Sequence, residues 1–213
     1  MFFKKYSELY DTINSDKPYK KEINFVYEWA KKPRSIVDIG CGTAAYWRHY
    51  PPGVDVIGIE KSKSMIARSD FKCRIHNFDI TTAAPNWKLD TATALFQVIN
   101  YIPRHDWWKN IPVKKGGYFI FDMWDKERVD KDGFQETSKM VDGVFRIIRP
   151  INYDGKSVDL KIDVWSAEDY FQESHKMYLY SSLDIQRFCG NEFEIVAVKP
   201  TKRWQTWYKC RRK

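Results

Sequence analysis

The sequence lacks the patterns that mark metal centres, disulfide-stabilised folds and membrane segments. Its four cysteines, at positions 41, 73, 189 and 210, form no CxxC pair and have no Cys/His ligand spacing. We therefore expect reduced thiols, with neither a zinc site nor a disulfide framework. No apolar run approaches the roughly 18 residues that cross a bilayer, and the opening segment MFFKKYSELYDTI has charges where a signal peptide needs its apolar centre. These absences predict a cytoplasmic protein that binds neither metal nor membrane.

The sequence also lacks a concentrated basic region, although it is basic overall. Lys and Arg number 36 against 28 Asp and Glu, which gives a formal net charge of +8. The basic residues are spread along the chain, and only positions 209–213 are dense, which we expect to form a solvated tail. A dedicated nucleic-acid groove is therefore disfavoured. A phosphorylated small substrate would explain the same charge.

Repeats and low-complexity linkers are absent too, and 43% of the 213 residues are hydrophobic. A chain of this size can bury one substantial core but is short for two enzyme domains. We predict one domain with four parts: an N-terminal helical lid at 1–32, a core at 33–136, an antiparallel strand insertion at 137–180, and a last helix with two strands at 181–213.

Hydrophobic periodicity predicts that helices and strands alternate. Apolar residues recur every three to four positions between Leu9 and Ala30, which indicates two helices, the second opened by Pro18. Short apolar, β-branched segments predict strands at 35–39, 54–59, 73–76, 91–96 and 118–121. Helices are expected between them, at 44–49, at 62–68 and from Arg104 onward. Such alternation is typical of a parallel sheet with helices on both faces.

The pattern changes after about position 139. Segments 144–148, 158–164 and 175–180 are separated by an Asp154-Gly155 turn and a charged turn, which predicts antiparallel strands. Ser182 is expected to cap a helix that stops at Gly190, and strands at 193–198 and 204–210 to complete the first sheet. The predicted fold class is α/β, with a Rossmann-like seven-stranded, mostly parallel sheet and an antiparallel β insertion after strand five.

The strand at 35–39 runs into the glycine-containing turn Gly40-Cys41-Gly42. Glycines at a strand-to-helix turn let backbone amides approach a ligand without obstruction by side chains. Glu60 lies twenty residues beyond Gly40, at the end of the second strand, where a carboxylate can accept hydrogen bonds from both hydroxyls of a ribose. Each residue also has a structural interpretation, in which the glycines only form a tight turn and Glu60 is a solvated helix cap.

Two more strand ends carry polar residues that suit an adenosine ligand. Asp79 follows the third strand and is placed to bind the amino group of an adenine, while Ile80 is placed to pack on its ring. The alternative is that Asp79 only caps the following turn. Phe96 and Gln97 end the fourth strand, beside the crevice where open α/β sheets hold ligands. Four such features in this order favour an adenosine-binding site.

These residues resemble the class I S-adenosylmethionine-dependent methyltransferases over positions 34–123, through DIGCGTA, Glu60, Asp79 and GGYFIFD. The nicotinamide dehydrogenases are the rival family, but their GxGxxG motif is missing. Ala44 departs mildly from the methyltransferase pattern, which commonly has glycine there. Nearly the whole chain is similar to a small-molecule subgroup that includes N,N-dimethyltransferases of nucleotide-linked amino sugars, through YSELYD at 6–11, LFQVINYI at 95–102, FDMW at 121–124, ESHKMYLY at 173–180 and QTWY at 205–208.

The resemblance implies S-adenosylmethionine as cofactor and a small-molecule acceptor such as a nucleotide-linked sugar. Tyr10 and Tyr19 would close over the cofactor, and Asp38 would bind its amino-acid end. The full set of expected cofactor-binding residues is Tyr10, Tyr19, Asp38, Gly40, Cys41, Gly42, Thr43, Glu60, Lys61, Met65, Asp79, Ile80, Phe96 and Gln97.

An amine acceptor must lose its proton before it attacks, and the candidates to assist are Tyr101, His105 and His175. Tyr101 ranks first, since it stands where the amino-sugar enzymes have a histidine. The structural alternatives are that His105 is a surface residue and that His175 is a strand residue facing solvent. Trp124 is expected to wall the acceptor pocket, and the remaining tryptophans singled out as packing residues are Trp107, Trp108, Trp204 and Trp207.

The leading hypothesis is N-methylation of an amino sugar or a comparable small amine. O-methylation of a sugar or metabolite is an alternative, as is methylation of RNA or protein. The NPPY or DPPY motif of base-amine enzymes is missing, because strand four ends in QVIN. A non-catalytic subunit with the same fold is a third possibility, since fold alone does not guarantee chemistry. A homodimer is compatible with the sequence, which leaves open whether the late strands pair between subunits.

Overall fold

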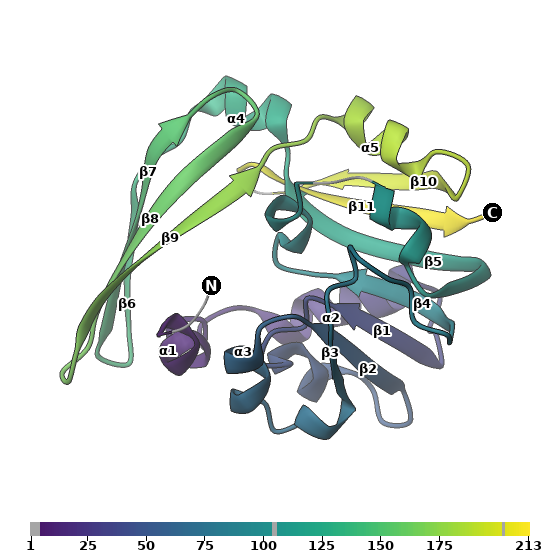
Figure 1. Cartoon of the computed structure of the whole chain (residues 1–213), viewed down its shortest axis with the longest axis horizontal. Coiled ribbons are helices and arrows are strands. Elements are labelled where there is room, and N and C mark those ends of the chain that lie inside the picture. Colours follow the sequence, from purple (N-terminus) through teal and green to yellow (C-terminus); the bar gives the residue numbers. More distant parts are fainter. Residues whose placement is uncertain (1–4, 104–105, 202) are drawn as a thin grey trace.

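The computed structural model describes residues 5–103, 106–201 and 203–213, which form two β-sheets with helices around the larger one (Figure 1). The larger sheet contains the last strand of the chain, and the smaller sheet stands to one side (Figure 1). Among the described residues, no helix is long and apolar enough to cross a membrane.

The N-terminal half contains mainly helices and short parallel strands. Its elements are α1 (Tyr6–Ile13), α2 (Tyr19–Trp29), β1 (Ser35–Ile39), the 3₁₀ turn η1 (Ala45–His49), β2 (Asp55–Glu60), α3 (Lys63–Arg68), η2 (Lys72–Arg74), β3 (Ile75–Asn77), β4 (Leu89–Ala94), η3 (Val98–Tyr101) and η4 (Asp106–Asn110).

The C-terminal half is rich in longer strands. Its elements are β5 (Val113–Trp124), α4 (Lys126–Asp132), β6 (Thr137–Val141), β7 (Val144–Tyr153), β8 (Ser157–Trp165), β9 (Tyr170–Tyr178), α5 (Ser182–Cys189), β10 (Phe193–Pro200) and β11 (Gln205–Arg212).

The larger sheet has seven strands in the order β10-β11-β5-β4-β1-β2-β3. Strands β1 to β5 pair in parallel, whereas β11 runs antiparallel to both β5 and β10. The carboxyl ends of β1, β2 and β4 therefore meet at one edge of the sheet. This is the edge at which open α/β sheets bind their ligands.

The smaller sheet consists of β6, β7, β8 and β9, all antiparallel. Its inner face packs on α1, through Tyr6 and Ile13 of the helix and Val144, Ile162 and Val164 of the sheet. Because α1 lies between this sheet and α3, the N-terminal segment bridges the two parts of the fold (Figure 1).

Both faces of the seven-stranded sheet are covered. On one face α2 and η1 bury Ile23 and Trp47, and on the other η4 and α5 bury Trp108 and Ile185. The tryptophans predicted as packing residues are buried, as expected: Trp107, Trp108, Trp204 and Trp207. Because both faces of this sheet are buried, the sequences of its strands are nearly continuous apolar runs.

Several predicted elements differ in detail from those observed. Segment 45–49 is a 3₁₀ turn rather than an α-helix, because Ala44 takes a left-handed conformation that breaks the helix start. The helix expected from Arg104 is only the turn η4, and its predicted first residue lies outside the described residues. The third strand is shorter than predicted, since 72–74 form a 3₁₀ turn. The cap of α5 is Ser181 rather than Ser182, in a capping box with Asp184.

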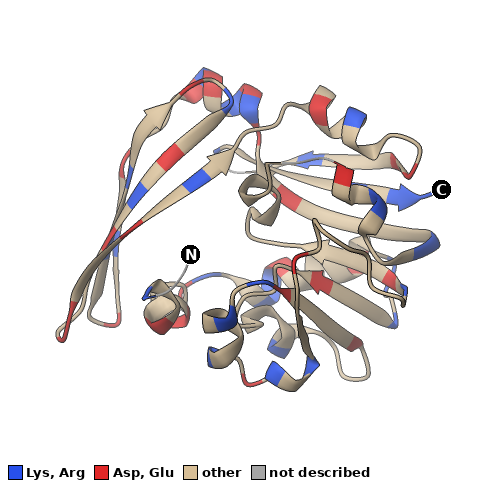
Figure 2. Ribbon diagram, in the orientation of Figure 1, with Lys and Arg blue, Asp and Glu red and all other residues tan. Residues whose placement is uncertain are grey.

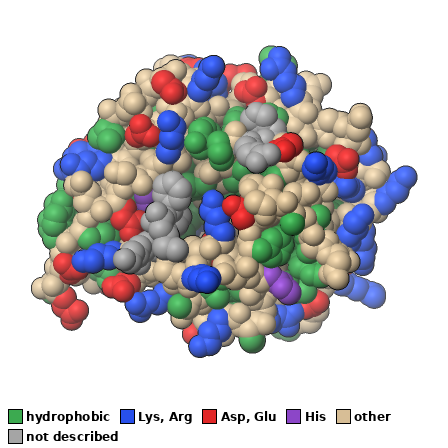
Figure 3. All heavy atoms as spheres, viewed as in Figure 1, with side chains coloured by type: hydrophobic (Ala, Val, Ile, Leu, Met, Phe, Trp, Pro, Cys, Tyr) green, Lys and Arg blue, Asp and Glu red, His purple; other side chains and the backbone are tan. Residues whose placement is uncertain are grey.

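The basic C-terminal segment is not a solvated tail, contrary to expectation. Residues 205–212 form β11, which lies inside the larger sheet between β5 and β10. Lys209 is buried, and its ammonium group lies 4.0 Å from the centre of the Tyr118 ring. Lys and Arg are distributed over both sheets and the helices (Figure 2), and on the face shown in Figure 3 they are dispersed rather than gathered into one patch.

Candidate active site

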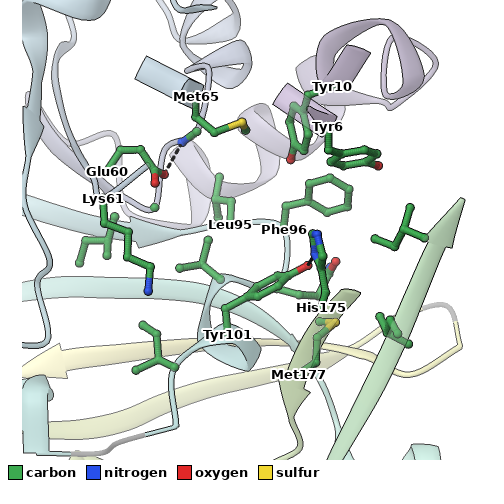
Figure 4. Close-up of a pocket in the computed structure, with 18 of the residues that line it drawn as sticks. Tyr6, Tyr10, Glu60, Lys61, Met65, Leu95, Phe96, Tyr101, His175 and Met177 are labelled. Carbon is green, nitrogen blue, oxygen red and sulfur yellow. Dashed lines mark hydrogen bonds between the residues drawn. The ribbon is translucent and has the colours of Figure 1, made fainter. Parts of the chain in front are cut away.

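A cavity of about 410 Å³ opens at the carboxyl ends of β1, β2 and β4. The seven-stranded sheet forms one side of it, and the inner face of the four-stranded sheet forms the opposite side. Helix α1 adds Tyr6 and Tyr10 (Figure 4). Segments from both halves of the chain therefore build one site.

The glycine turn after β1 forms part of the cavity wall. Gly40 has φ +65°, and a Cβ atom there would lie 2.7 Å from the side chain of Val98. Gly42 has φ +58°, and a Cβ atom there would lie 3.0 Å from the Met65 side chain. Both positions therefore favour glycine for conformation, and Gly40 also for space, whereas the flexible end of Met65 could move away from a Cβ atom at Gly42.

Glu60 ends β2 and points into the cavity (Figure 4), and two backbone amides donate hydrogen bonds to its carboxylate. Gly42 N–H donates to Oε2 at 2.9 Å, and Ser62 N–H donates to Oε1 at 2.7 Å. Burial raises the pKa of Glu60, against these amide bonds, which favour the charged form. The residue is only 9% exposed, so the alternative of a solvated helix cap is wrong. Each carboxylate oxygen keeps a second acceptor site for a ligand.

Four of the predicted cofactor-binding residues lie on the same side of the cavity, including Asp79 and Ile80, which were expected around an adenine. Met65 and Ile80 are buried there, while Lys61 and Asp79 are partly exposed. Asp79 Oδ1 accepts hydrogen bonds from the amide and hydroxyl of Thr81, so this residue does cap the following turn. Its other oxygen, Oδ2, lies 3.9 Å from Lys61 Nζ. The turn and a ligand can therefore share one carboxylate.

A smaller cavity of about 30 Å³ adjoins the glycine turn and contains the other predicted cofactor residues. Its lining includes Tyr10, Tyr19, Asp38, Cys41 and Thr43. Both oxygens of Asp38 already have protein donors, the Thr93 hydroxyl and the Trp47 indole N–H, each at 2.9 Å. Thr43 donates to Asp11 at 2.6 Å, which ties the turn to α1.

The loop after β4 has two consecutive residues in the left-handed region, Phe96 with φ +67° and Gln97 with φ +59°. Such a pair is strained, at a cost of about 1–3 kcal/mol per residue. Asp122, fully buried on β5, holds it by accepting from the Phe96 amide at 2.6 Å and from the Gln97 side chain at 2.5 Å. Burial raises the pKa of Asp122, although hydrogen bonds, including one from Gln205, favour its carboxylate. Strain held this firmly at a strand end is typical of functional sites.

Opposite Glu60, three residues form a hydrogen-bonded chain. The Tyr101 hydroxyl lies 3.0 Å from His175 Nδ1, and His175 Nε2 lies 3.2 Å from Glu173 Oε2. A carboxylate can only accept, so the His175 proton belongs on Nε2, and Nδ1 accepts from the tyrosine hydroxyl. His175 is 1% exposed, so the alternative of a solvent-facing strand residue is wrong.

Burial and hydrogen bonds determine the ionisation of Tyr101 and Glu173. Burial raises the pKa of Tyr101, and the neighbouring Tyr6 raises it further, so the hydroxyl stays neutral. Burial tends to raise the pKa of Glu173 as well. Hydrogen bonds from His175 and from the amides of Tyr6 and Lys5 nevertheless hold this pKa below its usual value. A charged carboxylate therefore faces a neutral phenol across the imidazole.

The remaining walls of this half of the cavity are largely apolar. They come from the four-stranded sheet and from the end of β5, and include Trp124, Ile148, Leu160, Ile162 and Met177. A second cavity, of about 160 Å³, shares Trp124, Ile148 and Leu160 with the first and extends to Arg203 and Trp204. The part of the cavity beside the four-stranded sheet, together with this second cavity, thus has room for an extended small molecule.

Every predicted site residue in the described part of the chain lines either the cavity of about 410 Å³ or the cavity of about 30 Å³ beside the glycine turn. His105 lies outside the described residues. The roles assigned to them remain predictions. Sequence analysis missed Tyr6, Asp122, Arg146 and Glu173. Two of these follow from spacing, because Tyr6 is one helical turn before Tyr10, and Glu173 shares a strand face with His175.

No protein-family model matches the sequence, and no curated protein matches it. Solved structures do. An S-adenosylmethionine-dependent methyltransferase from Clostridium acetobutylicum matches 98% of this chain over 98% of its own, with TM-score 0.79 and 22% identity. CalS10, an amino pentose methyltransferase from Micromonospora echinaspora, matches 100% of this chain over 98% of its own, with TM-score 0.79 and 18% identity. The chain has the methyltransferase fold. The sugar N-methyltransferase KedS8 from Streptoalloteichus shares this methyltransferase fold at TM-score 0.75 and 18% identity, over 98% of this chain and 93% of its own.

The methyltransferase fold agrees with the fold class expected from the sequence. The seven-stranded, mostly parallel sheet and the separate antiparallel sheet after β5 are as predicted, and the structure adds that β11 runs antiparallel beside β5. The late strand β10 pairs with β11, and β11 pairs with β5 of the same chain. Strand pairing between subunits is therefore not needed to complete this sheet.

Proposed function

We propose that the protein is an S-adenosylmethionine-dependent methyltransferase that methylates the amine of a small molecule of the amino-sugar class. The observation that carries the proposal is one cavity with Glu60 on one side and the hydrogen-bonded Tyr101–His175 pair on the other. Similar folds in an amino pentose methyltransferase and a sugar N-methyltransferase support the choice of acceptor.

The residues present suit the cofactor. A side chain at Gly42 would approach Met65 and narrow the space between the turn and α3. Glu60, in the same cavity, has acceptor sites for ribose hydroxyls, and Ile80 provides an apolar surface for a ring. Asp38 and Thr43 line the adjoining cavity, where the amino-acid end would lie. When bound, S-adenosylmethionine supplies a methyl group already activated by its sulfonium charge.

The chain's main task is then to hold and orient the acceptor nucleophile. We call the part of the cavity beside the four-stranded sheet the acceptor half. Its walls include the apolar residues Ile148, Leu160, Ile162 and Met177, which disfavour water there. Tyr10 and Phe96 lie between the two halves, with ring centres 6.4 Å apart (Figure 4). Because α1 lies over the cavity, the site favours a small molecule over RNA or a protein side chain.

Tyr101, His175 and Glu173 can take up the proton that an amine releases. The Tyr101 oxygen accepts an N–H hydrogen bond from the acceptor while its own proton is donated to His175 Nδ1. As the amine gives up its proton, the tyrosine passes its proton on to Nδ1. Glu173 stabilises the resulting imidazolium through Nε2. The phenol ends neutral, as its raised pKa requires.

The proposal can be tested in two separate steps. Calorimetry should first detect binding of S-adenosylmethionine and none of NADH. Labelled cofactor should then be incubated with nucleotide-linked amino sugars, with matched sugars that carry a hydroxyl in place of the amine, and with RNA. We expect transfer to the amines alone. Transfer only to hydroxyl groups or only to RNA would overturn the assigned acceptor while leaving the cofactor assignment intact.

A further inference from the structure

Arg146 is the one arginine that lines the main cavity within the described part of the chain. It lies on β7, where it pairs with Lys139 of β6 and Val164 of β8. Its neighbours on the same face of β7, Val144 and Ile148, are apolar. The guanidinium of Arg146 therefore lies on an otherwise apolar strand face, in the acceptor half of the cavity.

Arg146 forms no ion pair among the described residues, although its charge, after that of Lys139, helps to hold the pKa of Asp16 below its usual value. Its Nη1 donates to the Tyr6 hydroxyl at 2.9 Å, and its Nε is buried with no hydrogen-bond partner. The adjacent Lys139 is paired with Asp16 at 2.7 Å. Burying an unpaired charged donor is costly, so such a group is expected to meet an acceptor in the functional state.

Anchoring α1 does not explain the charge. The first turn of α1 is already held by Glu173, which accepts from the Lys5 and Tyr6 amides at 3.0 and 2.9 Å. The Tyr6 ring also packs edge-on against Tyr10 and Phe171. A neutral donor could give the Tyr6 hydroxyl the same hydrogen bond, whereas a ligand anion would use the charge of the guanidinium.

We propose that Arg146 binds an anionic group of the acceptor, a phosphate or a carboxylate, so that the substrate is an amine that also carries such a group. The inference rests on the proposed function and narrows its substrate class. Tyr6 connects this point to the reacting centre, because its hydroxyl bonds Arg146 and its ring centre lies 6.1 Å from that of His175. The anion therefore lies about one tyrosine ring from the Tyr101–His175 pair. Planar guanidinium groups bind both kinds of anion through two parallel hydrogen bonds.

The first test follows the Arg146 Nε–H group directly and needs no turnover. Its NMR signal, assigned with the Arg146→Lys variant, is recorded while orthophosphate or acetate replaces chloride at constant ionic strength. We expect a saturable shift of this signal, while the Nε–H signal of Arg149, on the opposite face of β7, stays in place. The stronger of the two titrations identifies phosphate or carboxylate as the preferred group. No shift, or equal shifts at both arginines, would overturn the proposal.

The second test compares amines with and without an anionic group. Glucosamine, glucosamine 6-phosphate and glucosaminic acid are titrated calorimetrically into protein saturated with S-adenosylhomocysteine. We expect Arg146→Met to weaken binding of an anionic ligand by at least about tenfold and to change glucosamine binding by less than about threefold. Lys176→Met is the matched control, because it removes one positive charge from the outer face of the same sheet. Equal losses for charged and neutral ligands, or wild-type protein that does not prefer the anions, would contradict the proposal.

The two proposals fail in different ways. If S-adenosylhomocysteine does not bind, the proposed function is wrong, whatever the anion titrations show. If the cofactor product binds and neither anion shifts the Arg146 signal, the proposed function stands and the substrate class inferred here is wrong.

Discussion

The Tyr101 hydroxyl lies 3.0 Å from Nδ1 of His175, although the two residues are 74 positions apart in the chain. Tyr101 closes the turn after β4, and His175 lies in the middle of β9 on the inner face of the smaller sheet. The hydrogen bond therefore joins the two sheets across the cavity. Any change to either residue should affect both the chemistry and the spacing of the acceptor half.

We expect Tyr101→Phe to lower kcat by about 100-fold, because it removes the oxygen that accepts the amine proton. The affinity for S-adenosylmethionine should stay within about twofold, since Tyr101 and Glu60 lie on opposite sides of the cavity. Steady-state kinetics and calorimetry give the two numbers. Tyr153→Phe is the control, because Tyr153 is exposed and bonds only Asp130. An unchanged kcat would remove Tyr101 from the proton path.

Glu60→Ala should weaken S-adenosylmethionine binding by about tenfold or more, which corresponds to the loss of about 1.4 kcal/mol of hydrogen bonding to the ribose. Calorimetry measures the effect. Glu28→Ala, an exposed site on α2, is the control for loss of one negative charge. Equal affinities of Glu60→Ala and wild type would exclude Glu60 from the cofactor site.

Gly40→Ala should destabilise the fold more than Gly53→Ala. Both glycines have positive φ, but a Cβ atom at Gly53 meets nothing within 4 Å, whereas one at Gly40 meets Val98 at 2.7 Å. We expect about 1 kcal/mol of lost unfolding free energy at Gly53 and about 2–4 kcal/mol at Gly40. Urea titration compares them. The double variant Gly40→Ala/Val98→Ala should recover part of the difference, and no recovery would show that the side-chain contact is unimportant.

Asp38 predicts a dependence of stability on pH. Burial raises its pKa to about 6, against hydrogen bonds from Trp47 and Thr93. The unfolded value is about 3.9, so the folded state binds the proton more tightly, and this stabilisation is complete below about pH 4 and lost as the pH rises through about 6. Relative to Asp38→Asn, wild type should lose about 2 kcal/mol of unfolding free energy between about pH 4 and pH 7. Urea titrations at intermediate pH values test this, and parallel profiles for the two proteins would contradict it.

Local patterns predicted most of the fold. The run Ser35–Ile39 is β1 as expected, because β-branched residues before a glycine turn leave little choice. The 3₁₀ turn at 45–49 was not predictable, since its cause is the left-handed Ala44, and the sequence does not display backbone angles. The buried position of Lys209 was also missed, because its partner Tyr118 is brought near only by strand pairing.

The candidate site was predictable where its residues follow strand ends. Gly40, Glu60 and Asp79 lie at successive strand ends, and the parallel order brings them together. Asp122 and Arg146 could not be found this way. Asp122 accepts hydrogen bonds from a loop 25 or more positions away in the sequence. Arg146 bonds Tyr6 of α1, a contact that only the folded structure shows.

Most of the acceptor wall comes from one uninterrupted stretch, β6 to β9, whereas the predicted cofactor residues come mainly from the ends of β1 to β4. Changes within this single stretch of strands can therefore alter one wall of the cavity and leave the glycine turn and Glu60 as they are. Laboratory chimeras that exchange this stretch between homologues should inherit the substrate range of the donor.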